Sequence, residues 1–157
     1  MARITLALLI FIFAILQNGC KKDESLTHIS DLDSKVLAAV NKFRVENGLQ
    51  SITHQYILAD DAKNYSSKMA SDEVAYGIDG VLNSLSALQN NLGGDACGAV
   101  VQMSEFNNAD TIVNRMIRDP LKQQVLKQNF NQTSVGSAKD SEGNWFVTLL
   151  FIHIPSK

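Results

Sequence analysis

The chain has 157 residues, of which 45% are apolar and only 19% charged, and its formal net charge is −2. This composition is typical of one folded domain with short additional segments, and it excludes an intrinsically disordered chain. The 14 Lys and Arg residues are scattered along the chain. The sequence therefore lacks the basic stripe of a nucleic-acid-binding protein, and we expect no nucleic acid partner.

The N-terminus reads as an export signal. Arg3 precedes an apolar run over residues 4–16, which is shorter than the roughly 20 residues that a membrane-spanning helix needs. The run ends in "LQNGC", and Gly19 directly before Cys20 resembles a bacterial lipoprotein signal, in which the cysteine carries the lipid and becomes the mature N-terminus. The alternative is an ordinary secretory signal in which Cys20 is incidental.

The lipoprotein resemblance implies three segments: a signal peptide over 1–19, a lipidated N-terminus and polar tether over 20–32, and a folded domain over 33–157. The run "CKKDES" after the cleavage point resembles the surface-export signal of Bacteroidota lipoproteins. We therefore expect a protein anchored through Cys20 to the bacterial outer membrane or cell surface, with the periplasmic face as the alternative. Two or three acyl chains suffice for durable membrane attachment.

Two amphipathic helices open the domain. Ser30 and Asp33 are candidate N-caps of the first, and Gly48 can end it in a left-handed conformation. Its apolar face is formed by Val36, Val40 and Phe43. After a turn at "LQSITHQ", the second helix carries apolar residues at helical spacing, namely Leu58, Ala62, Tyr65 and Met69.

A third helix is expected after a turn formed by Gly77, Asp79 and Gly80, and it should end at Gly93-Gly94. Its apolar residues are Val81, Leu85, Leu88 and Leu92. The segment "ACGAVVQM" then reads as a short strand.

Asp110 is the expected cap of a fourth helix. This helix should end near Asp119, because the residue before a proline avoids the helical conformation, and Pro120 suits the first turn of a new helix. Two strands, "SVGSA" and "WFVTLLFIHI", follow, and the second is apolar enough to be buried on both faces. This order predicts an α+β fold, with about four helices flanking a small antiparallel sheet.

The segment "VLAAVNKFRVENGLQSITHQYILADDAKNYSSKMA" resembles the opening of the CAP superfamily (cysteine-rich secretory, antigen 5 and pathogenesis-related proteins, with the SCP-like extracellular domain), especially its bacterial branch. The resemblance continues through "IDGVLNSL", "CGAVVQ", "RMIRDP" and "SVGSAKDSEGNWFVTLLF", and covers Asp33 to Phe151. It implies an α-β-α sandwich with a cleft, which many members line with two histidines and two glutamates that can hold a divalent metal.

The positions that match this cleft carry other residues. Ile78 stands where the family has a histidine, Gly98 where it has a glutamate, and Leu121 where it has a second histidine. An alignment shifted by one residue puts Lys122 at that last position instead. None of these side chains is a zinc-type ligand. The resemblance therefore implies a degenerate cleft without a metal, a cofactor or the family's catalytic groups.

The remaining candidates are weaker. His28, His54 and His153 are far apart in the sequence, and each is most simply a solvated or hydrogen-bonded side chain. Cys97, within an apolar strand, is most simply a small buried residue, with a reactive thiol as the alternative.

We therefore expect a monomeric, lipid-anchored envelope protein that is not an enzyme and that acts as a binding or interaction module for an envelope protein, glycan or lipid. One alternative is an envelope hydrolase with a site of its own, which would require Asp119, Glu105 and His54 to cluster. Another is a carrier of an apolar ligand, which would require an apolar cavity near Ile78 and Leu121.

Overall fold

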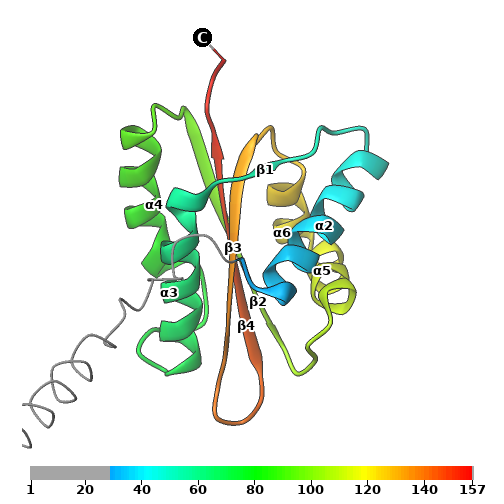
Figure 1. Cartoon of the computed structure of the whole chain (residues 1–157), viewed down its shortest axis with the longest axis vertical. Coiled ribbons are helices and arrows are strands. Elements are labelled where there is room, and N and C mark those ends of the chain that lie inside the picture. The colour runs from blue at the N-terminus through cyan, green and yellow to red at the C-terminus, as the bar shows by residue number, and fades with distance from the viewer. Residues whose placement is uncertain (1–28, 157) are drawn as a thin grey trace, which may run out of the picture.

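The structure is a computed structural model that describes residues 29–156. The predicted signal peptide, the lipidation site Cys20, most of the tether and His28 lie outside the described residues. The described residues form a four-stranded sheet between two layers of helices (Figure 1). The helices are α2 (Asp31–Glu46), α3 (Ala59–Ala70), α4 (Asp79–Asn91), α5 (Ala109–Arg118) and α6 (Pro120–Leu126), and a 3-10 helix, η2 (Tyr56–Leu58), precedes α3.

The sheet has the strand order β1-β3-β4-β2. Its strands are β1 (Thr53–His54), β2 (Ala96–Ser104), β3 (Gln132–Lys139) and β4 (Trp145–His153). β4 pairs antiparallel with both β2 and β3, whereas β1 pairs parallel with β3. The α+β fold with helices on both faces is thus confirmed, but the sheet is mixed rather than antiparallel. The "LQSITHQ" segment, expected as a turn, contributes the parallel strand β1.

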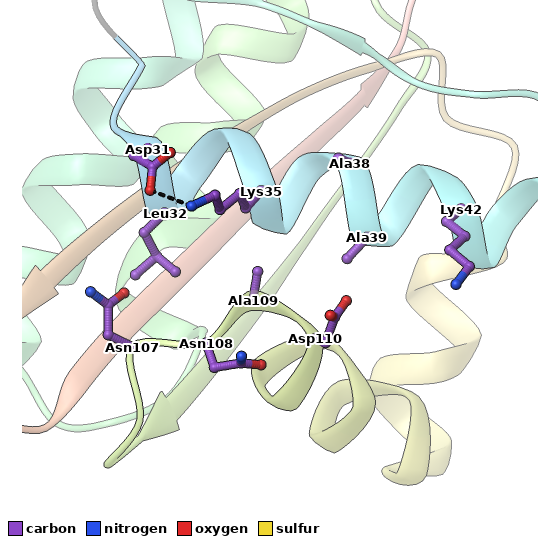
Figure 2. A pocket seen from close by; sticks show the side chains of 10 residues that line it. All are labelled: Asp31, Leu32, Lys35, Ala38, Ala39, Lys42, Asn107, Asn108, Ala109 and Asp110. Carbon is purple, nitrogen blue, oxygen red and sulfur yellow. Dashed lines mark hydrogen bonds and ion pairs between the residues drawn. The ribbon is translucent and has the colours of Figure 1, made fainter.

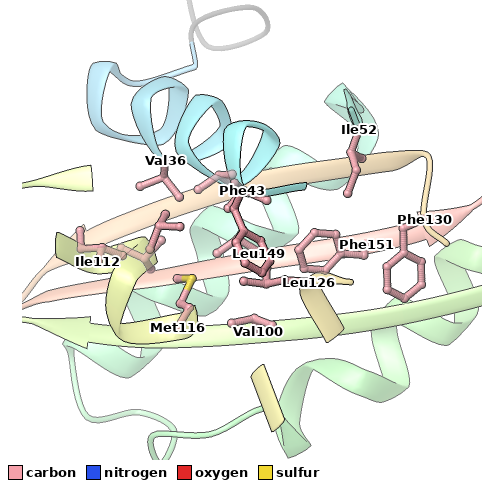
Figure 3. Packing of buried hydrophobic residues seen from close by; sticks show 14 of the residues in the cluster. Val36, Phe43, Ile52, Val100, Ile112, Met116, Leu126, Phe130, Leu149 and Phe151 are labelled. Atoms are coloured by element: carbon pink, nitrogen blue, oxygen red, sulfur yellow. The ribbon is translucent and has the colours of Figure 1, made fainter. Parts of the chain in front are cut away.

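One face of the sheet packs against α2, α5 and α6 (Figure 1). The predicted apolar stripe of α2 is buried there, with Val36 and Val40 fully inaccessible. Figure 3 shows Val36 and Phe43 of α2 on the side of the sheet that carries Val100, Leu149 and Phe151. Burial of an apolar side chain contributes about 1.5 to 3 kcal/mol. This cluster therefore supplies much of the energy that holds the helices of this layer to the sheet.

The other face packs against α3 and α4 (Figure 1). The apolar stripe of α3 is buried as expected, and it packs against the opposite side of β2 and β4. The alternation of side chains along a strand explains this division, since Leu149 and Leu150 of β4 belong to different cores. β4 is buried from Phe146 to Ile152, which confirms the expectation of a strand covered on both faces.

Two expected helix starts differ in detail. The cap of α5 is Asn108, whose side chain accepts a hydrogen bond from the backbone N–H of Thr111 at 2.8 Å, and Asp110 lies inside the first turn instead. A carboxylate there is still favourable beside the helix dipole. Gly80, expected in a turn, lies in the first turn of α4. A side chain at that position would meet the Tyr65 hydroxyl at 2.9 Å. The glycine serves close packing between α3 and α4.

The other helix ends agree with expectation. The Ser30 hydroxyl caps α2 by accepting a hydrogen bond from the Asp33 N–H at 3.1 Å, and Gly48 follows the helix with a φ of 74°. α5 ends at Arg118 and Pro120 begins α6. The Asp119 carboxylate caps this new helix by accepting from the N–H groups of Leu121 and Lys122. The Asp119-Pro120 break is therefore a capped corner between two helices.

Candidate functional site

The positions that the family resemblance assigns to the cleft lie on three elements next to the free edge of the sheet at β2. Ile78 is the residue before α4, Gly98 lies in β2, and Leu121 and Lys122 lie in the first turn of α6. α4 packs on the face of one core and α6 on that of the other. Among the described strands, β2 packs against α4, α5 and α6.

Gly98 is covered by apolar side chains. A side chain added at this position would meet Cζ of Phe130 at 2.9 Å and Cγ1 of Val125 at 3.4 Å. The space that a longer residue would need in the cleft is thus taken by the aromatic ring and by α6. The Phe130 ring therefore packs directly on Gly98. The face of β2 that carries Gly98 belongs to the core under α2, α5 and α6.

Lys122 crosses the sheet edge. Its ammonium group donates to the Tyr76 hydroxyl at 3.2 Å and to Oε1 of Gln102 at 2.9 Å, and it lies 5.8 Å from the centre of the Tyr76 ring. Tyr76 stands two residues before Ile78, so Lys122 joins α6 to the segment that leads into α4. Ile78 itself is half-buried against the α3/α4 core, and Leu121 is 75% exposed. The structure therefore brings Lys122 to the Ile78 segment, while Gly98 faces Phe130 and Val125.

The backbone of β2 is blocked at this edge by side chains of the chain itself. The Tyr76 hydroxyl donates to the carbonyl of Val101 at 3.2 Å. The carbonyl of Met103 accepts from the Gln102 amide at 2.8 Å and from the Arg115 guanidinium at 3.5 Å. Occupied edge groups hinder pairing with a strand of another chain. A partner protein at this edge would therefore contact side chains rather than pair with the β2 backbone.

Four large apolar side chains are exposed around this edge. They are Tyr76 (50% exposed), Met103 (39%), Phe106 (56%) and Leu121 (75%). Two cations lie between them: Lys122 beside Tyr76, and Arg115, whose guanidinium is 5.9 Å from the centre of the Phe106 ring and 3.1 Å from the Glu105 carboxylate. We call these six residues, Tyr76, Met103, Phe106, Arg115, Leu121 and Lys122, the β2-edge surface. Sequence reasoning missed its aromatic members, because exposure is decided by tertiary packing.

The acidic and histidine residues that a hydrolase would require are engaged separately. Asp119 caps α6, and Glu105 pairs with Arg115. His54 lies in β1, near the buried carboxylate of Asp33, and its ring packs edge-on against Tyr56. Burial lowers the pKa of His54, and the Asp33 charge opposes that shift. These residues have different partners on different elements, so the clustering that would favour a hydrolase is not found among them.

Cysteine and histidine do not combine into a metal site in the described part of the chain. No group of three or more His, Cys, Asp or Glu side chains within residues 29–156 is placed to hold a metal ion. Cys97 is half-buried, and its sulfur lies 3.9 Å from the Ser86 hydroxyl. His153 instead forms a 2.6 Å contact between Nδ1 and the Asp95 carboxylate. The 58-residue separation of this pair gave no local sequence signal for it.

Three surface hollows are described, and none of them is lined by Ile78, Gly98, Leu121 or Lys122. The first, of about 450 Å³, lies between α2 and α5 (Figure 2). Figure 2 shows Ala39 and Ala109 facing its middle, with Asp31 bonded to Lys35 at one end. The others, of about 380 and 360 Å³, lie beside His153 and beside Asp140. Among the described residues, no helix is both long and apolar enough to cross a membrane.

Comparisons with known proteins agree with this architecture. The family model described as "CAP: Cysteine-rich secretory protein family" matches residues 37–151. No curated protein matches the chain.

Solved structures with the same fold include bacterial surface and secreted proteins. An outer surface protein of Borrelia burgdorferi superposes with a TM-score of 0.65 at 13% identity, covering 82% of this chain and 98% of that one. An extracellular protein containing an SCP domain, from Bacillus anthracis, gives 0.64 at 16% identity, and a cysteine-rich secretory protein from Staphylococcus aureus gives 0.62 at 16%. Each of these two superpositions covers 78% of this chain, which spans only 40% and 38% of the two structures, respectively.

Proposed function

Because the chain belongs to the CAP family of cysteine-rich secretory proteins, we propose that it is a lipid-anchored protein of the bacterial cell envelope that acts as a non-enzymatic binding module through its β2-edge surface. The partner that this surface fits best is another protein of the envelope. The proposal rests on one observation above the others, which is the exposure of Tyr76, Met103, Phe106 and Leu121 around a single sheet edge.

The composition of the β2-edge surface supports a protein partner. Aromatic residues, Met and Arg are enriched in the parts of interfaces that contribute most to affinity. Contiguous exposed apolar patches on soluble domains mark interaction sites more often than chance. The rings of Tyr76 and Phe106 are each held by a cation, Lys122 and Arg115 respectively. Side chains held in place in the free protein lose less entropy on binding, which favours recognition.

The replacement of the family's polar cleft residues supports a role other than catalysis. Gly98 packs against the Phe130 ring, which leaves little space for a longer side chain, and the ammonium of Lys122 is committed to Tyr76 and Gln102. A general acid or base must reach its substrate within hydrogen-bonding distance. A glycine packed against a ring and an engaged ammonium group are poorly suited to that task. An apolar-ligand carrier finds less support, since Leu121 is 75% exposed rather than part of an enclosed apolar wall.

Crosslinking from the β2-edge surface tests the binding function. A photoreactive phenylalanine analogue in place of Leu121 is expected to crosslink to an envelope protein in intact cells. The matched control places the same analogue at Val45, which is 57% exposed at the end of α2. Specific adducts from position 121 that disappear on Phe106→Ser would support the proposal. Equal adducts from both positions, or none from either, would argue against it.

The membrane anchor is tested separately. We expect Cys20→Ala, or treatment with globomycin, to prevent lipidation and release the protein from the membrane fraction. The sequence around Cys20 motivates this expectation, and the surface and extracellular locations named for the structural neighbours are consistent with it. Membrane fractionation that stays unchanged under both treatments would overturn the anchoring part of the proposal and leave the β2-edge surface untouched.

A further inference from the structure

A polar hollow of about 380 Å³ lies at the end of the sheet where β4 leaves it, beside the C-terminal segment. The side chains that line it include Ser51, Asn129, Asn131, His153 and Ser156. Ligand pockets have volumes of roughly 300 to 1,000 Å³. The hollow is thus large enough for a ligand of the size of one sugar ring. It is unrelated to the degenerate cleft positions, none of which line it.

His153 is the oriented group of this hollow. Its Nδ1 lies 2.6 Å from the Asp95 carboxylate, and the backbone N–H of Asp95 donates to the carbonyl of His153 at 3.0 Å. Gly94 permits this approach, because a side chain there would meet that same carbonyl at 2.8 Å. A carboxylate only accepts hydrogen bonds when ionised, so Nδ1 carries the proton. In the neutral form of the ring, Nε2 is then left with a lone pair and can accept a hydrogen bond.

The walls of the hollow are held in place by two side chains, the buried Arg44 and the half-buried Asn131. The guanidinium of Arg44 donates to the carbonyls of Gln50, Gln128 and Phe130, which fixes the two loops that form one side. The Asn131 amide donates to the carbonyl of Ile154 at 2.7 Å and accepts from its N–H at 2.9 Å. The segment after His153 is thereby fixed as well. Rigid walls reduce the entropy cost of binding.

The charge of the hollow selects the ligand. The described residues that line it include no Lys, Arg, Asp or Glu, and the nearest charge to the imidazole is the Asp95 carboxylate. A carboxylate or phosphate ligand would meet repulsion from Asp95, and the guanidinium of Arg44 behind the wall is already engaged by backbone carbonyls and does not line the hollow. A hydroxyl group can donate to Nε2, while the serine hydroxyls and the Asn129 amide can serve as either donors or acceptors for its neighbours.

We propose that this hollow binds a small, uncharged, hydroxylated ligand, with a sugar unit as the type, through a hydroxyl that donates to Nε2 of His153. Asp95 is the positioning residue that fixes the tautomer. The site lies at the end of the molecule that carries the C-terminus, whereas the loop between β2 and α5, with Phe106, lies at the other end (Figure 1). The proposal is therefore independent of the β2-edge function, and either can fail without the other.

The test is a titration of the full-length protein, labelled with ¹⁵N-histidine and held in detergent, with glucose, N-acetylglucosamine, glycerol and acetate. A sugar is expected to shift the ring ¹⁵N signal of Nε2 of His153, with a Kd in the range of about 1 mM and above. In Asp95→Asn the uncharged amide can either accept from Nδ1 or donate to it, so the proton is no longer held on Nδ1 and Nε2 is an acceptor for only part of the time. This change should weaken sugar binding about three- to tenfold. Asp95 is a surface residue, so thermal unfolding should be unchanged.

Three results would overturn this proposal. The first is a His153 signal unmoved by either sugar up to about 0.1 M, where even a weak site would be occupied. The second is a shift caused by acetate and not by the sugars. The third is sugar binding that is equally strong in Asp95→Asn. Glycerol acting as well as the sugars would likewise overturn the choice of a sugar ring. His54→Gln is the matched control and should leave sugar binding unchanged.

Discussion

Arg44 is the clearest case of a single residue that joins distant parts of the chain. Its side chain is 1% exposed, and it donates to four backbone carbonyls, those of Gln50, Leu126, Gln128 and Phe130, at 2.7 to 3.2 Å. Burial lowers the pKa of this guanidinium, which nevertheless stays charged because its ordinary pKa is so high. Its planar fork suits several acceptors at once, which a lysine ammonium cannot match.

We predict that Arg44→Lys lowers the free energy of unfolding by about 2 to 4 kcal/mol, because buried carbonyls of the 126–130 loop lose their donors. Urea denaturation measures the loss. Arg118→Lys, on the exposed end of α5, is the control and should change stability by less than about 0.5 kcal/mol. Equal stability of the two variants would show that water replaces the guanidinium without cost.

His54 gives a prediction about pH. Burial lowers its pKa, although the nearby Asp33 charge acts in the other direction, and Nδ1 of His54 and Oδ1 of Asp33 both lack a hydrogen-bond partner within the described residues. The unfolded chain, with an ordinary histidine pKa of about 6.5, takes up the proton at a higher pH than the folded chain. Stability should therefore fall as the pH drops below about 6.5.

Chemical denaturation at a series of pH values measures this slope, and His54→Gln should remove the part that His54 contributes. The two proteins should differ least in pH dependence above neutrality, where the histidine is uncharged in both states. Parallel slopes for the native protein and His54→Gln between about pH 7 and 5 would contradict the assignment.

At the scale of elements, helices with a long apolar period were predictable and short or distant pairings were not. The stripes of α2 and α3 and the corner at Asp119 follow from local spacing and capping. β1 is only two residues long, and its partners, Gln132 and Thr133, come nearly 80 residues later, so no local pattern could identify it. The choice of Asn108 over Asp110 as a cap was missed for a different reason, since both residue types cap helices.

The contact between α3 and β3 depends on a glycine. A side chain at Gly136 would overlap the backbone of Ala62 and Lys63, and the carbonyl of Gly136 accepts a hydrogen bond from Ser66 at 2.8 Å. We predict that Gly136→Ala destabilises the protein by about 3 kcal/mol or more, because a helix backbone cannot yield as a side chain would. Thermal unfolding measures the effect.

Ser134→Ala is the matched control for this prediction. Ser134 lies two residues earlier in β3, on the same face, and its buried hydroxyl has no partner among the described residues. Removing an unsatisfied polar group should be neutral or slightly stabilising. A Gly136→Ala variant as stable as Ser134→Ala would mean that α3 can move away from the sheet.

For the candidate site, the family resemblance predicts substitutions at the positions of Ile78, Gly98, Leu121 and Lys122, and with them the loss of the metal ligands. This stays a prediction. The resemblance did not indicate what replaced them. The lid that Phe130 forms over Gly98 and the bond from Lys122 to Tyr76 join residues more than 30 positions apart. Such contacts depend on how the helices sit against β2, which no local pattern encodes.

For the whole molecule, the sheet edges argue for a single chain in solution. β1 offers only two residues for pairing, and the carbonyls of Val101 and Met103 on β2 are already bonded. We predict that full-length Cys20→Ala protein, which lacks the lipid, is a monomer by light scattering. A concentration-dependent dimer would contradict this. If Leu121→Ser dissolved that dimer, self-association would lie at the β2-edge surface.

The place of β4 in the chain has a consequence for biosynthesis. Both cores close on this strand, which pairs with β2 and β3 and follows all the other described helices and strands in chain order. While the ribosome is still adding residues 145–153, the helices have no surface on which to bury their apolar faces. Isolated helices of this length are marginal in water. Neither core of this protein can therefore close before β4 has been made, and a truncation that removes β4 would leave both cores open.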